Sequence, residues 1–203
     1  MSHYSDKHYT ASHDFDKFYY GIFFKKGDKI LDIGCSTGNF IAQDPKNITG
    51  IDIDKDAIKM AKKRGLSAIC HDITKRLPFK KNSIENVNCR HVLEHLEDPM
   101  DFMMEIHRIL KKNGRLILIT DKYSKHFWDD YTHKRPFTKR SLEQMTYDAG
   151  FRKYHVYDFP SKGVFGAGFL HKHKMISPKT LSKLYRIAGK IFKHYGILLE
   201  AVK

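Results

Sequence analysis

At 203 residues the chain has the length of one domain, and its hydrophobic fraction of 41% is ordinary for a soluble globular protein. Its formal net charge of +14 is unusually high and predicts attraction to an anionic partner such as nucleic acid, an anionic lipid surface or an acidic substrate. The longest apolar run, residues 116–119, is too short to span a membrane as a helix.

The chain contains three cysteines, Cys35, Cys70 and Cys89. Their spacing fits no zinc pattern, and their odd number does not suit a disulfide framework. Each lies in or just after a predicted strand, so we expect buried, reduced thiols, no metal site and a cytoplasmic protein. From the polar N-terminus we expect no signal peptide.

Strands and helices are expected to alternate along the chain. A polar arm and a short helix occupy residues 1–26. The predicted strands are residues 29–33, 48–53, 66–70, 84–89, 115–120, 151–159 and 196–202. Three later helices are expected to begin at a capping side chain and to end at a glycine, with the pairs Asp54 and Gly65, Asp98 and Gly114, and Thr138 and Gly150.

This alternation predicts an α/β fold, a doubly wound and mainly parallel sheet with helices on both faces. No repeat or linker divides the chain, so we expect residues 1–203 to form a single domain. Ligands bind such sheets outside the carboxyl ends of the strands, at the point where the strand order reverses. The turn Gly-Cys-Ser-Thr-Gly at residues 34–38 follows the first strand and belongs at that point.

Two carboxylates strengthen the prediction of a ligand site at this turn. Asp52 lies eighteen positions after Gly34, at the end of the second strand, where a carboxylate can accept hydrogen bonds from both hydroxyls of a ribose. Asp72 follows the third strand and can accept from an adenine amino group. The alternative is that both are ordinary turn residues. Together with the turn, they indicate an adenosine site.

The class of adenosine ligand is narrowed by what the turn lacks. A dinucleotide fingerprint needs glycines at positions 34, 36 and 39, but positions 36 and 39 are Ser and Asn. A phosphate-binding loop needs a Lys-Ser/Thr pair after its last glycine, whereas Gly38 is followed by Asn39 and Phe40. Both interpretations are therefore disfavoured.

Residues 31–38, Leu-Asp-Ile-Gly-Cys-Ser-Thr-Gly, resemble motif I of the class I S-adenosylmethionine-dependent methyltransferases. Residues 50–54 resemble the ribose-binding motif of that family, and residues 71–73 resemble its adenine motif. Further resemblance to the small-molecule branch, the type 11-like methyltransferases, lies at residues 77–79, 92–99 and 109–116. The match covers about residues 27–159 and departs from the family at Ser36, where glycine is more common.

The resemblance implies a Rossmann-like, seven-stranded sheet with strand order 3-2-1-4-5-7-6 and an antiparallel strand seven. It also implies S-adenosylmethionine as the methyl donor and S-adenosylhomocysteine as the product. Residues around the methionine end would be Asp32, Gly34, Cys35, Ser36, Gly38 and, through its backbone, Arg90. Asp52 would bind the ribose, and the adenine would contact Ile53, Asp72 and Ile73.

The segment at residues 126–138 also resembles small-molecule members and supplies the candidate acceptor residues. The sulfonium already activates the methyl group, so the protein mainly aligns the acceptor, and a base is needed where the acceptor is a hydroxyl. His133 is the candidate catalytic base, Trp128 and Tyr131 would line an apolar acceptor, and Arg135 would bind an anionic one. The alternative is that the segment only leads into the helix capped by Thr138 and that His133 makes a structural hydrogen bond.

Residues 160–195 are expected to form an insertion or lid that contains a basic amphipathic helix. Such a helix either contacts an anionic membrane or nucleic acid, or packs on its own core with a charged outer face. We expect a methyltransferase that acts on a small-molecule or lipid-like acceptor, at oxygen. The alternatives are methylation of RNA or other nucleic acid, and a non-catalytic S-adenosylmethionine-binding module.

Overall fold

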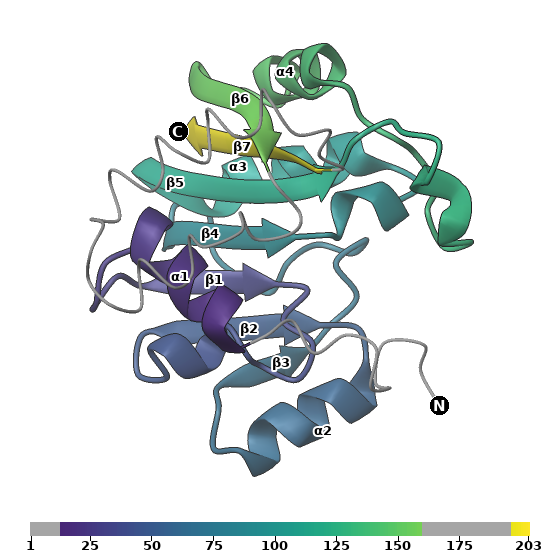
Figure 1. Cartoon of the computed structure of the whole chain (residues 1–203). Coiled ribbons are helices and arrows are strands. Elements are labelled where there is room, and N and C mark those ends of the chain that lie inside the picture. The colour runs from purple at the N-terminus through teal and green to yellow at the C-terminus, as the bar shows by residue number, and fades with distance from the viewer. Residues whose placement is uncertain (1–12, 160–195) are drawn as a thin grey trace, which may run out of the picture.

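In the computed structural model, which describes residues 13–159 and 196–203, seven strands form one sheet in the order β3-β2-β1-β4-β5-β7-β6 (Figure 1). The five parallel strands are β1 (Ile30–Ile33), β2 (Ile48–Asp52), β3 (Ala68–Cys70), β4 (Ile84–Arg90) and β5 (Leu110–Asp121). Strand β7 (Gly196–Val202) runs antiparallel to β5 and to β6 (Lys153–Phe159). The predicted fold class and strand order are confirmed.

Helices cover both faces of this sheet. On one face, α1 (His13–Phe23), α2 (Lys55–Lys63) and the short η1 (Ile41–Gln43) supply buried side chains to one hydrophobic cluster. On the other face, α3 (Pro99–Ile109) and α4 (Lys139–Asp148) supply a second cluster. Figure 1 shows α1 lying across the front of the sheet. Two short 3₁₀ helices, η2 (Leu93–His95) and η3 (Phe127–Asp129), follow the carboxyl ends of β4 and β5.

Five of the six predicted signals at the helix ends act as expected. Asp54, Asp98 and Thr138 each accept a hydrogen bond from a backbone N–H in the first turn of their helices. Gly65 and Gly150 follow the last turns of α2 and α4 with φ angles of +74° and +104°, which glycine adopts without steric cost. These caps set the helix bounds and thereby the lengths of the connections to the strands.

Gly114 does not end α3, so that prediction is wrong. The helix stops at Ile109, and β5 begins at the next residue. Ahead of Arg115 the register of β5 against β4 shifts, so the intervening residues bulge out of the ladder. A Cβ on Gly114 would lie 2.8 Å from the carbonyl oxygen of Lys111, so glycine serves a close backbone approach here. The other strand bounds lie within two residues of those predicted.

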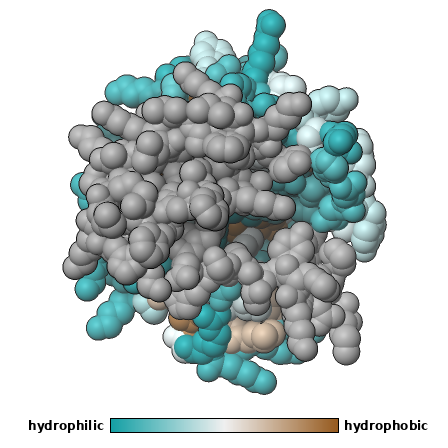
Figure 2. Space-filling view, viewed as in Figure 1, coloured by the Kyte–Doolittle hydropathy of each residue, from teal (hydrophilic) through white to brown (hydrophobic). Residues whose placement is uncertain are grey.

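Two of the three thiols lie in the core of the protein. Cys35 and Cys89 are buried as expected, whereas Cys70 is exposed, which corrects the expectation of three buried thiols. No helix among the described residues combines the length and hydrophobicity needed to cross a bilayer. The described surface on the face viewed in Figure 2 is mostly hydrophilic, with a small hydrophobic area near α2. The expected insertion at residues 160–195 lies outside the described residues.

Gly34→Ala tests whether the turn after β1 is sterically determined. Gly34 has a φ of +76°, and a Cβ there would overlap Cγ2 of Val92, so the substitution is expected to lower the free energy of unfolding by about 2 kcal/mol or more. Gly21, within α1 and with open space around its Cα, is the matched control; Gly21→Ala is expected to raise it by about 0.5–1 kcal/mol. Urea unfolding followed by circular dichroism measures both, and equal effects would contradict the steric account.

Candidate active site

The turn after β1 is held against the end of β2. The backbone N–H groups of Gly34 and Cys35 both donate to the carbonyl oxygen of Ile51, at 2.9 and 3.2 Å. Gly38 has a φ of +85°, and Ser36 has a φ of +47°. Ser36 therefore takes up the left-handed conformation that the more common glycine would adopt without strain. The departure from motif I therefore places a serine in a conformation that favours glycine.

Asp52 is the last residue of β2, and its carboxylate faces the turn. Oδ2 accepts from the backbone N–H of Ser36 at 2.8 Å, and Oδ1 accepts from that of Asp54 at 2.9 Å. Burial raises the pKa of Asp52, and these two N–H groups only partly offset the rise. Each carboxylate oxygen can accept a further hydrogen bond, so Asp52 can position the turn and bind a ribose at the same time.

The predicted adenine residues follow β2 and β3. Ile53 has 64% of its surface exposed, an apolar side chain left open at the carboxyl end of a strand. Ile73 packs in part against the core. Oδ1 of Asp72 accepts from the N–H and the hydroxyl of Thr74, at 2.9 and 2.7 Å, and these hydrogen bonds lower the pKa of Asp72. The local turn therefore engages one oxygen of Asp72, and among the described residues nothing is hydrogen-bonded to Oδ2.

A row of buried polar groups lies between the sheet and α1. Oδ1 of Asp32 accepts from Nδ2 of Asn88 at 2.7 Å, and Oδ1 of Asn88 accepts from the hydroxyl of Tyr19 at 2.9 Å. Burial raises the pKa of Asp32 to about 7, although Arg90 and the hydrogen bond from Asn88 act to lower it. Arg90, predicted to contribute its backbone, directs its side chain under α1, where Nη2 lies 2.6 Å from Oδ1 of Asp16.

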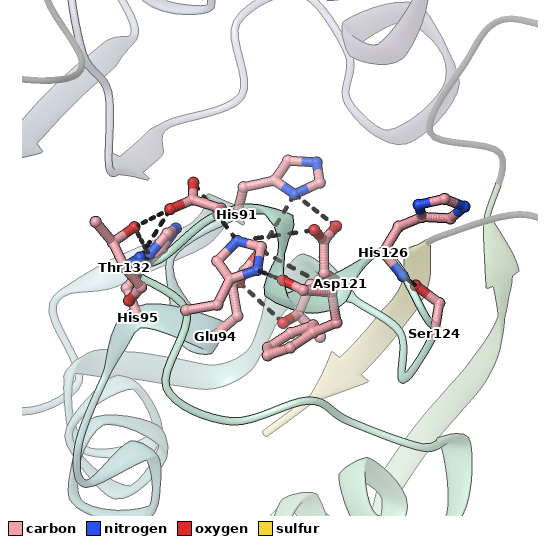
Figure 3. A network of polar contacts seen from close by, with 11 residues as sticks. His91, Glu94, His95, Asp121, Ser124, His126 and Thr132 are labelled. Atoms are coloured by element: carbon pink, nitrogen blue, oxygen red, sulfur yellow. Dashed lines mark hydrogen bonds and ion pairs between the residues drawn. The ribbon is translucent and has the colours of Figure 1, made fainter.

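A second polar cluster lies at the carboxyl ends of β4 and β5 (Figure 3). Its centre is the fully buried carboxylate of Glu94, which accepts from Oγ1 of Thr120 at 2.9 Å and lies 3.2 Å from Nδ1 of His91. The carbonyl oxygen of Glu94 accepts from the N–H of Lys134 at 2.7 Å. Glu94 therefore ties η2 to the end of β5 and to the segment after η3.

His91 bridges two carboxylates in this cluster. Its Nδ1 lies 3.2 Å from both Glu94 and Asp121, and its φ is +52°. Figure 3 shows both contacts as dashed lines. Desolvation lowers the pKa of His91, but the hydrogen bonds to Asp121 and Glu94 outweigh it and raise the pKa to about 10. His91 is therefore a cation at neutral pH and offsets the charge of its two neighbours.

His133 is largely buried and has a defined tautomer. Its Nδ1 lies 2.7 Å from the carbonyl oxygen of Phe127, and because a carbonyl only accepts, Nδ1 must donate. The neutral ring then carries its lone pair on Nε2, which lies 3.9 Å from a carboxylate oxygen of both Asp121 and Asp130. The ring of His95 packs edge-on against it at 4.8 Å. The structural hydrogen bond of His133 that the alternative predicted is therefore present, as the contact with Phe127. It leaves Nε2 suited to accept a proton.

Two sets of side chains in this cluster have the composition of metal ligands. The ligand atoms of Glu94, His95 and His133 lie within 4.8 Å of one another, and so do those of His91, Glu94 and Asp121. The Glu94 carboxylate is shared between the sets and is already hydrogen-bonded within the protein. The expectation that the protein needs no metal stays a prediction.

The structure does not gather the remaining acceptor candidates around one pocket. Trp128 and Tyr131 are 59% and 81% exposed, so the described residues leave both rings largely open to solvent. Arg135 lines a cavity of about 260 Å³ between α3 and α4, together with Met100 and Met145. None of the predicted cofactor-binding residues lines that cavity.

Several polar residues of these clusters were not predicted from the sequence. Asn88 lies two residues before Arg90 in β4, so both side chains lie on the same face of the sheet. Asp32 pairs with Asn88 from the neighbouring strand β1 and lies on that face too. A polar residue at period two inside an otherwise buried strand was the available signal. His91 and Asp121 stand at the carboxyl ends of β4 and β5, where polar side chains point to a ligand site.

The comparisons with known proteins agree with this geometry. A family model described as a methyltransferase domain matches residues 31–118. The mitochondrial ubiquinone biosynthesis O-methyltransferase of Schizosaccharomyces pombe is 36% identical over 106 residues, which cover 46% of this chain and 38% of that protein. An uncharacterised protein of Methanocaldococcus jannaschii is 31% identical over 195 residues, which cover 88% and 80% of the two chains. The chain belongs to the class I S-adenosylmethionine-dependent methyltransferases.

The fold of this methyltransferase agrees with that assignment. A crystal structure of an S-adenosylmethionine-dependent methyltransferase from Archaeoglobus fulgidus superposes with a TM-score of 0.69 at 19% identity and covers 95% of each chain. The methyltransferase spans only 38–56% of the length of the first three curated relatives that it matches. S-adenosylmethionine is the cofactor of this family, and the open Ile53, the Asp52 carboxylate and the turn at Gly34 fit it.

Asp32→Asn tests the buried carboxylate through the pH dependence of stability. The pKa of Asp32 rises from 3.8 to about 7 on folding, so the native state keeps a proton that the unfolded chain has lost. The contribution of Asp32 to the free energy of unfolding therefore falls as the pH rises from about 4 to 7. Urea unfolding of the cofactor-free protein should show the variant gaining stability relative to the wild type between about pH 4 and pH 7. A difference that does not change with pH would contradict the raised pKa.

Proposed function

We propose that this methyltransferase transfers the methyl group of S-adenosylmethionine to a hydroxyl oxygen of a small-molecule or lipid-like acceptor. The observation that carries the proposal is the tautomer of His133, because its Nδ1 donates to Phe127 and its Nε2 can take the proton of a hydroxyl. The 36% identity to a ubiquinone biosynthesis O-methyltransferase supports oxygen as the methylated atom.

Two groups of residues have separate roles in this reaction: one binds the methyl donor, and the other activates the acceptor. When bound, S-adenosylmethionine supplies a methyl group that its sulfonium already activates. The turn at Gly34 and the carboxylate of Asp52 hold the donor outside β1 and β2. His133 Nε2 accepts the proton of the acceptor hydroxyl, and the carboxylates of Asp121 and Asp130 stabilise the imidazolium that results.

The acceptor itself is inferred from the side chains near His133. Trp128 lies in η3 and Tyr131 soon after it, and both expose an aromatic ring. Exposed aromatic rings in the same segment as a base favour a planar or apolar acceptor that stacks on them. The net charge of +14 supports a second candidate, RNA, through attraction to its phosphates.

Methyl transfer from tritiated S-adenosylmethionine separates these acceptors. The protein is incubated with a lipid and small-molecule extract of the source organism and, in parallel, with its total RNA at low and moderate salt. We expect label in the organic phase, on a product that mass spectrometry identifies as a methyl ether. Label confined to RNA would favour the second candidate, and cofactor binding without label in any fraction would favour a non-catalytic module.

His133→Gln tests the base. The substitution removes the proton acceptor and is expected to lower kcat by about 10²- to 10³-fold with little change in the KM for S-adenosylmethionine. His126→Gln is the matched control, since His126 lies in the same segment but pairs with the exposed Asp129. The control should keep kcat within about twofold. Equal losses in both variants would show that the segment is disturbed rather than that a base is removed.

A further inference from the structure

Arg90 and Asp16 form a buried ion pair between β4 and α1 that the roles described above do not explain. Nη2 of Arg90 lies 2.6 Å from Oδ1 of Asp16, and the two side chains are 18% and 1% exposed. Taking two charges out of water is costly unless their remaining donors and acceptors are also satisfied. The stability of the pair therefore depends on what its other donors and acceptors bind.

Both partners have unused hydrogen-bonding capacity. Oδ2 of Asp16 is buried and has no hydrogen-bond partner among the described residues. The guanidinium of Arg90 has five N–H donors, and within the described part of the chain it donates to Asp16 alone. The rings of Tyr19 and Phe40 lie 4.8 and 5.3 Å from its central carbon, where they interact with its charge but do not accept its N–H groups as a carboxylate would.

Arg90 also faces a second buried carboxyl group. The buried carboxylates of Asp16 and Asp32 both interact electrostatically with this one guanidinium. A ligand that completes the site must offer a cationic donor to a carboxylate oxygen and an anionic acceptor to the guanidinium. The zwitterionic head group of an α-amino acid has both, an ammonium and a carboxylate on the same carbon.

The position of Arg90 matches the donor end of the site. Cys89 pairs with Ile33, the residue before Gly34, so Arg90 lies beside the turn. A Cβ built on Gly34 would lie 3.9 Å from the carbonyl oxygen of Arg90. The backbone of Arg90 thus lies next to the turn that follows β1, and its guanidinium lies 5.3 Å from the ring of Phe40, which follows that turn by two residues.

We propose that Arg90 and Asp16 form the receptor for the amino acid head group of S-adenosylmethionine. The guanidinium binds the α-carboxylate, and Oδ2 of Asp16 accepts from the α-ammonium. The assignment rests on the proposed function, because it assumes the methyl donor. It adds the side chain of Arg90, where the family resemblance implied only its backbone, and it makes α1 part of the cofactor site.

Two ligands that differ in the head group test this receptor by isothermal titration calorimetry. S-adenosylhomocysteine carries the head group, whereas 5′-methylthioadenosine has the same adenosine and sulfur without it. Arg90→Met and Asp16→Asn are each expected to lower the affinity for S-adenosylhomocysteine about 10- to 100-fold, because each removes a charge-assisted hydrogen bond. The affinity for 5′-methylthioadenosine should stay within about twofold of the wild-type value. Unchanged binding of the second ligand also shows that the variants fold.

Arg115→Met is the matched control. Nη2 of Arg115 donates to the carbonyl oxygen of Phe23 at 2.9 Å, so this arginine also holds α1, at its C-terminal end. The control should leave both affinities within about twofold.

The contradicting outcomes are distinct. If Arg90→Met leaves the affinity for S-adenosylhomocysteine unchanged, or lowers the affinity for both ligands alike, the ion pair only anchors α1 and the proposed receptor is wrong. If the wild type binds neither ligand, the proposed function fails and the receptor with it. Binding of both ligands by the wild type with equal affinity also overturns the receptor, while leaving the adenosine site intact.

Discussion

The register of β1 between β2 and β4 is the constraint on which the site depends. Asp32 pairs with Gly50 on one side and with Asn88 on the other, which places the polar row under α1. A shift of one residue would turn Asp32 to the opposite face, into the cluster packed by α3 and α4. A Cβ on Gly50 would lie 2.5 Å from Sγ of Cys35, so the close approach of β2 to the turn also depends on this register.

The two polar clusters have different electrostatic character. At the donor end, the guanidinium of Arg90 interacts with the carboxylate of Asp16 and with Asp32. Burial raises the pKa of Asp32 to about 7, and a cationic ligand nearby would favour its ionised form. At the acceptor end, the imidazolium of His91 offsets its two carboxylate neighbours. A donor that carries a sulfonium and an ammonium suits the first cluster, and a base that gains a proton suits the second.

Much of the fold was predictable because its signals are local. Capping side chains such as Asp54 and Thr138 act within one turn, and the final strand has the predicted bounds. Gly114 was misjudged because a glycine after a helical pattern resembles a helix end, whereas its reason is a close approach to Lys111 within a bulged strand. That approach depends on the pairing of β5 with β4, which the local sequence does not encode.

The candidate site was predictable in part, for the same reason. Gly34 and Asp52 belong to short motifs at strand ends, so their positions follow from the sequence. The pairing of Arg90 with Asp16 joins residues 74 positions apart and exists only once α1 packs on the sheet. The exposure of Trp128 and Tyr131 likewise depends on tertiary packing, and their role as an apolar lining stays a prediction.

We expect the carboxyl ends of β1 and β2 to bind the adenosine of the methyl donor. A crystal structure of the complex with S-adenosylhomocysteine tests it most directly. We expect ribose hydroxyls within hydrogen-bonding distance of the Asp52 carboxylate and the adenine ring against Ile53. A nucleoside bound elsewhere, for example in the cavity lined by Arg135, or a ribose without contact to Asp52, would contradict it.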